Sequence, residues 1–83
     1  MQKWDSMNVV IEKRIGWNIR KLREKAKMTQ EQLAAQLQLR GCDITRSAVA
    51  KIEVGQRHVY VDEIMLIKEI LKVHFEDIFT ITK

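Results

Sequence analysis

The stretch from Thr45 to Lys51 carries a helical face of basic and short side chains. At about 100° per residue, a helix that begins here turns one set of residues to the same side: Arg46, Ser47, Ala50 and Lys51. Arginine and lysine donate to guanine O6 and N7, serine bonds to either kind of base edge, and alanine meets a thymine methyl group. We therefore predict that these four residues contact base edges of double-stranded DNA.

Four polar residues at the ends of two expected helices, the one that follows Thr29 and the one that follows Thr45, suit contacts to an anion. Gln30 lies in the first turn of an expected helix, where the free N–H groups of the helix terminus and the side-chain amide hold a phosphate. The predicted phosphate contacts are Gln30, Thr45, Gln56 and Arg57. Such contacts fix the register of a protein on DNA without reading its sequence.

Two short helices must position these groups. Thr29 and Gln32 have the spacing of a capping box, which starts the first helix. Leu33 and Leu37 are one helical turn apart and mark its buried side.

The second helix extends from a Thr45 cap to about Val54, and Gly55 is placed to end it in a left-handed conformation. At 100° per residue, one side of this helix gathers Thr45, Ala48, Val49 and Ile52, opposite the four residues predicted to contact bases. The two helices therefore have opposite roles, since the first supports the fold and the second offers its outer face.

The most specific motifs are TQEQLA, which begins at Thr29, and the run SxxxxIExGxR from Ser47 to Arg57. Together they resemble the helix-turn-helix of the phage repressor and Cro family of bacterial transcription regulators, over most of the chain. The resemblance implies an all-α fold, a compact five-helix lambda-repressor-like DNA-binding domain. The chain departs from the family in a longer than usual turn between helices 2 and 3, from Gln38 to Ile44. We expect an extra turn on helix two and a tight reversal there, because Gly41 can stop a helix.

The resemblance also implies a structural ion pair and a mode of action. In the family, a glutamate of helix three pairs with an arginine of helix one, and the matching residues here are Arg23 and Glu53. The implied function is a sequence-specific transcription regulator that binds a double-stranded operator as a homodimer. Repression is the commoner mode of the family, so the resemblance implies a repressor.

Three further helices complete the expected domain. Helix one is predicted over Lys13 to Lys27, helix four from an Asp62 cap through Glu63 to about Lys72, and a short fifth helix or turn around Phe75 to Phe79. The core of helix four is expected at Ile64, Ile67 and Leu71. The resulting division is an N-terminal arm (1–12), the helix-turn-helix domain (13–79) and a C-terminal tail (80–83).

Trp17 falls outside the apolar stripe of helix one. One interpretation is that the N-terminal arm covers it, because Trp4, Val9, Val10 and Ile11 otherwise lack partners. The alternative is that Trp17 lies in a contact between subunits.

Charge and reactive residues narrow the class of protein. Residues 1–28 carry eight basic and three acidic groups, whereas residues 62–83 carry three basic and five acidic groups. The N-terminal third of the chain is therefore the part whose charge favours binding to a polyanion. The single cysteine, Cys42, excludes an intramolecular disulfide, and neither His58 nor His74 has a neighbouring nucleophile pattern. We therefore expect no enzyme, catalytic residue, metal site or cofactor. No apolar run is long enough to span a membrane, and a cytoplasmic location is expected.

Two rival functions stay open. An antitoxin of a toxin-antitoxin operon would keep DNA binding and use its extra apolar surface to hold a toxin. A helical protein-interaction module without DNA binding would be free to carry acids on the outer face of the second helix, and this chain carries none there.

Overall fold

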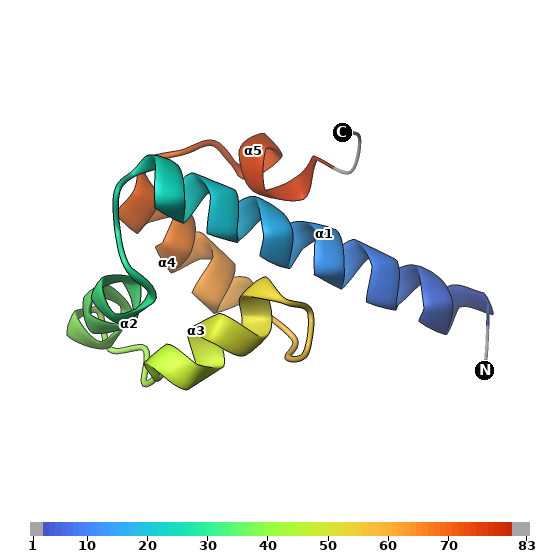
Figure 1. The fold of residues 1–83 in the computed structure, drawn as a ribbon, viewed down its shortest axis with the longest axis horizontal. Coiled ribbons are helices and arrows are strands. Elements are labelled where there is room, and N and C mark those ends of the chain that lie inside the picture. The colour runs from blue at the N-terminus through green and yellow to red at the C-terminus, as the bar shows by residue number, and fades with distance from the viewer. Residues whose placement is uncertain (1–2, 81–83) are drawn as a thin grey trace.

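Five helices account for most of the chain in the computed structural model, which describes the backbone of residues 3–80 and the side chains of residues 10–80 (Figure 1). In chain order they are α1 (Lys3–Lys25), α2 (Gln30–Leu39), α3 (Arg46–Glu53), α4 (Val61–Leu71) and α5 (Phe75–Phe79). No strand occurs among the described residues. The all-α, five-helix fold expected from the sequence is confirmed.

The core lies between α1, which packs against α3, α4 and α5, and α2, which packs against α3 and α4. Its most deeply buried large side chains come from all five helices and from the connection between α2 and α3: Ile19, Leu33, Leu37, Ile44, Val49, Ile67 and Ile78. The amide of Asn18 fastens α5 to α1, since its Nδ2 donates to the carbonyl oxygens of Ile78 and Thr80, both at 2.8 Å. A five-residue helix this short depends on such contacts, because it cannot hold itself in water.

Helix α1 begins at Lys3, ten residues earlier than the predicted start at Lys13. No glycine or proline interrupts the sequence before Gly16, so nothing local ends the helix there. Gly16 is itself helical and lets α1 approach α3 closely, because a Cβ at this position would lie 2.1 Å from the carbonyl oxygen of Ile52. The first turns of α1 project beyond the rest of the fold (Figure 1).

The long α1 also overturns the interpretation that an arm covers Trp17. A segment that continues the same helix cannot fold back over it, and Trp17 remains 43% exposed. The side chains of Trp4 and Val9, which were expected to help cover it, lie outside the described residues. Val10 is exposed as well.

The caps of α2 and α3 are those that the sequence predicts. Thr29 Oγ1 accepts from the Gln32 backbone N–H at 3.0 Å, and Gln32 Oε1 accepts from the Thr29 N–H at 2.8 Å. Thr45 Oγ1 accepts from the Ala48 N–H at 3.2 Å. Gly55 follows α3 with a φ of 77°, which is the left-handed conformation expected of it.

The connection between α2 and α3 is folded against the core. Helix α2 continues to Leu39, and Gly41 reverses the chain with a φ of 86°. Both the extra helical turn and the tight reversal agree with the prediction from the sequence. Gln38 Nε2 donates to the carbonyl of Ile44 at 2.7 Å, and the Ile44 side chain is buried. The end of α2 and the start of α3 are therefore joined directly, which fixes how α3 is presented.

The prediction that Asp62 caps α4 is wrong. The helix begins at Val61 with Tyr60 at the N-cap position. The Glu63 carboxylate accepts a hydrogen bond from the Tyr60 backbone N–H at 2.9 Å, so Glu63 and not Asp62 satisfies the free donor at the start of the helix. Asp62 lies inside the first turn. The core positions of α4, Ile64, Ile67 and Leu71, are buried as expected.

Candidate nucleic-acid interface

Helix α3 lies along one edge of the molecule (Figure 1). Arg46, Ser47 and Lys51 are exposed and Ala50 is half-buried, whereas Val49 and Ile52 on the opposite side are 2% exposed. The four residues predicted to contact bases therefore share one accessible surface. A short helix with donors and a methyl group on its free face has the dimensions and chemistry of a major-groove reader.

A buried ion pair holds the other side of α3 to α1. Arg23 Nε and Nη2 donate to the two carboxylate oxygens of Glu53 at 2.6 and 3.0 Å, and the residues are 8% and 3% exposed. Arg23 Nη1 also donates to the Met28 carbonyl at 2.7 Å, which ties in the segment before α2. The hydrogen bond to Glu53 raises the pKa of Arg23 above its already high ordinary value. The ion pair implied by the resemblance is thus present.

Gln30 joins this ion pair. Its Nε2 donates to Glu53 Oε1 at 2.9 Å, so three donors from two helices converge on one buried carboxylate. The predicted phosphate contact at Gln30 must therefore use the remaining N–H of its side chain or the backbone N–H groups of the α2 terminus. Nothing in the sequence pattern indicates that Gln30 also helps to hold Glu53 in place.

Arg57 forms an ion pair with Glu63 that the sequence did not predict. Its Nη1 and Nη2 donate to the two carboxylate oxygens of Glu63, both at 3.0 Å, and Nη1 also donates to the His58 carbonyl at 2.8 Å. The guanidinium lies over the Tyr60 ring, 5.4 Å from its centroid. Arg57 therefore stabilises the turn between α3 and α4 through contacts within the protein.

Glu63 is correspondingly more than a first-turn acid. Burial alone would raise its pKa, but hydrogen bonds from Arg57 and from the Tyr60 N–H outweigh burial and hold the pKa below its ordinary value. The sequence contained a signal for this, because Glu63 lies four and seven residues before the inward-facing Ile67 and Ile70. That spacing turns the carboxylate toward the core side of α4.

The remaining predicted contacts stay on the surface. Gln56 is exposed, and its backbone N–H donates to the Lys51 carbonyl at 2.8 Å, which holds it next to the end of α3. Thr45 is exposed although its hydroxyl caps the helix. His58, also in this turn, contacts the Glu12 carboxylate of α1 through Nδ1. The turn after α3 is therefore attached to both α1 and α4.

The described part of the chain contains neither a candidate metal site nor a helix that could span a membrane. Among these residues no group of three or more His, Cys, Asp and Glu side chains is placed to hold a metal ion. None of the described helices has the length and apolar character to cross a bilayer.

Comparison with known proteins identifies the architecture. A family model described as helix-turn-helix matches residues 19–78, from the middle of α1 through α5. Neither a search of curated proteins nor a search of solved structures found a match. The matched region contains α2, α3 and both partners of the Arg23 and Glu53 ion pair.

Proposed function

We propose that this chain binds one operator sequence in double-stranded DNA and represses transcription from it. The chain belongs to the Cro-like helix-turn-helix family of DNA-binding transcription regulators. The observation that carries the proposal is the outer face of α3, with Arg46, Ser47, Ala50 and Lys51 on one accessible surface. A module that had lost DNA binding would be free to place acids on this face, and none occurs there.

In this proposal the residues of α3 divide the reading of bases among them. Arg46 and Lys51 donate to guanine O6 and N7, Ser47 bonds to a neighbouring base edge, and Ala50 contacts a thymine methyl group. Each well-placed bidentate contact is worth about 1 to 3 kcal/mol of discrimination against the wrong base. The ion pair behind α3 supports this role, because it holds the helix at a fixed angle while its free face enters the groove.

Phosphate contacts position the helix and differ in strength among the proposed residues. Gln56 and Thr45 are exposed at the two ends of α3, and the α2 terminus at Gln30 offers free N–H groups. Arg57 is held by Glu63 and retains only its remaining N–H donors for a phosphate. Its larger contribution is to shape the turn that presents Gln56.

A homodimer on a near-palindromic operator completes the proposal. Two copies related by a two-fold axis place their α3 helices in successive major grooves when the half-sites are about 34 Å apart. A domain of this size gains enough phosphate contacts for tight binding only by doubling its footprint. An operator is reached on the chromosome, so a cytoplasmic location belongs to the same proposal.

Selection of bound sequences from a random duplex pool, with the mass of the complex measured in parallel, tests the proposal. A symmetric enriched motif and the mass of two protein chains per duplex support a dimeric regulator. Absence of any enriched motif contradicts it. A stoichiometric second protein in the complex isolated from its host would favour the antitoxin alternative.

A further inference from the structure

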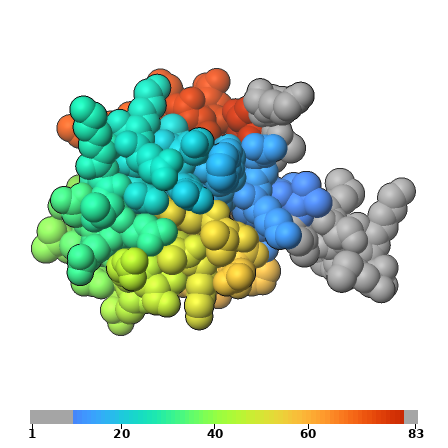
Figure 2. Space-filling view, in the orientation of Figure 1, coloured from blue at the N-terminus to red at the C-terminus, as the bar shows by residue number. Residues whose placement is uncertain are grey.

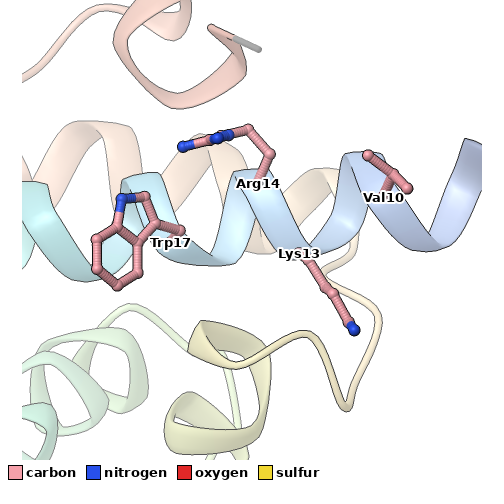
Figure 3. Close-up of a pocket in the computed structure, with 4 residues that line it drawn as sticks. All are labelled: Val10, Lys13, Arg14 and Trp17. Carbon is pink, nitrogen blue, oxygen red and sulfur yellow. The ribbon is translucent and has the colours of Figure 1, made fainter. Parts of the chain in front are cut away.

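A solvent-facing hollow on α1 is not used by the proposed contacts of α3 (Figure 3). It has a volume of about 580 Å³ and is lined by Val10, Lys13, Arg14 and Trp17. Val10 and Trp17 are 61% and 43% exposed, so apolar surface is offered to a partner and not to the core. Figure 3 shows Lys13 directed toward the chain that follows α3, with Arg14 directed away from it.

The hollow is strongly basic. The Arg20 guanidinium and the Lys21 ammonium lie over the Trp17 ring, 5.7 and 4.9 Å from its centroid. Glu24 pairs with both of these cations, at 3.3 and 3.9 Å.

Two cations of the hollow, Lys13 and Arg14, have no acidic partner among the described side chains, those of residues 10–80. The surface around Val10 and Trp17 therefore attracts an anion. A second copy placed face to face on the same surface would bring like charges together, which disfavours self-association there.

The hollow is continuous with the turn after α3. The Lys13 side chain packs on Gly55 so closely that a Cβ on Gly55 would lie 2.4 Å from Lys13 Cγ and 3.2 Å from Lys13 Cα. Gly55 immediately precedes the exposed Gln56. In Figure 2 the surface of α1 meets the surface of the chain between α3 and α4 on one side of the molecule. A polyanion that contacts this turn can continue onto α1.

We infer that the hollow on α1 binds the sugar-phosphate backbone of the duplex beyond the groove that α3 enters. Lys13 and Arg14 pair with phosphates, while the Trp17 ring and the Val10 side chain pack on the apolar faces of the sugars. The inference rests on the proposed function to the extent that the chain binds duplex DNA. It adds a contact to flanking DNA that carries no sequence information.

The test is the salt dependence of DNA binding on two duplexes. One duplex carries only the operator obtained from selection, and the other carries about one further helical turn, roughly ten base pairs, at each end. The double variant Lys13→Gln/Arg14→Gln is compared with the control Lys25→Gln/Lys72→Gln. The control removes the same charge from residues that line a different hollow, between α1 and the end of α4. Far-UV circular dichroism checks that both variants fold.

On the long duplex, the slope of log affinity against log salt concentration becomes shallower by about two for each protomer of the hollow variant, because each lost phosphate contact removes about 0.9. The control retains the wild-type slope, and on the short duplex wild type and hollow variant agree. Equal slopes for the hollow variant and the control on the long duplex would overturn the inference. So would the same loss on the short duplex.

A second readout reports on the hollow directly. In a Trp4→Phe background Trp17 is the only tryptophan, and its emission changes on addition of the long duplex and stays constant with the short one. Emission that is unchanged by the long duplex contradicts the inference. The experiment distinguishes failure of the two proposals. If the wild-type protein shows no sequence preference, but the hollow variant still has a shallower salt slope than the control on long random duplexes, only the specific operator is refuted. A wild-type protein that binds no duplex refutes both.

Discussion

Replacement of Arg23 by methionine tests the buried ion pair that holds α3. The change keeps a long apolar stem but leaves buried Glu53, which is 3% exposed, with Gln30 as the one side-chain donor left among residues 10–80. Breaking a buried pair from one side costs about 3 to 5 kcal/mol, because an uncompensated charge stays buried. A chain of 83 residues is stable by about 4 to 12 kcal/mol at the usual 0.05 to 0.15 kcal/mol per residue. Arg23→Met therefore removes a large part of the free energy of unfolding.

Urea unfolding followed by far-UV circular dichroism measures this loss. The matched control is Arg20→Met on the same helix, because Arg20 forms an exposed pair with Glu24 and its loss costs about 0.5 kcal/mol or less. The double variant Arg23→Met/Glu53→Leu removes both charges and is expected to regain much of the stability lost by Arg23→Met alone. The reasoning is refuted if Arg23→Met costs no more than Arg20→Met, or if the double variant shows no coupling between the two sites.

Three further predictions concern the turn after α3 and the contact of α1 with α3. Glu63→Gln lowers stability most at neutral pH. The folded-state pKa of Glu63 lies below the ordinary value of 4.5, so the stability from its Arg57 pair is present above that value and is lost as pH falls through the folded pKa. Urea midpoints from pH 7 down to pH 3 should show wild type and variant converging, and a constant difference would contradict this. Gly16→Ala destabilises the protein by about 1 to 3 kcal/mol in thermal or urea unfolding, since the new methyl meets the Ile52 carbonyl, and a gain from the better helix former would show the contact to be loose. Gln56→Ala weakens binding to the operator and to random duplexes by a similar factor in titrations, and a selective loss on the operator would place Gln56 against a base.

Local signals allowed the sequence to predict the parts of the fold that depend on neighbouring residues. Thr29 and Thr45 were identified as caps because a hydroxyl at the start of a helix satisfies a donor only a few residues away. Helical periodicity alone placed the buried Val49 and Ile52 opposite the exposed face of α3, although Thr45, on the same side as these two, is exposed. The Arg23 and Glu53 pair spans thirty residues and was accessible only through the resemblance to a family.

Contacts that depend on how separate elements meet could not be read in the same way. The pairing of Arg57 with Glu63 requires the path of an irregular turn, which periodicity does not describe. The contact of His58 with Glu12 joins residues 46 positions apart, and Glu12 lies one residue before the predicted start of α1. The extension of α1 past that start was missed because an N-terminal segment of mixed polar and apolar residues, without glycine or proline, is compatible with both an arm and a helix.

The central claim is that the outer face of α3 reads base sequence, and selection from a random duplex pool with wild type and Arg46→Ala in parallel tests it most directly. The account predicts a near-palindromic motif for wild type, and for Arg46→Ala the same motif with base preference lost at one matching position in each half-site. An Arg46→Ala motif identical to that of wild type, or no enrichment by wild type, would contradict the claim.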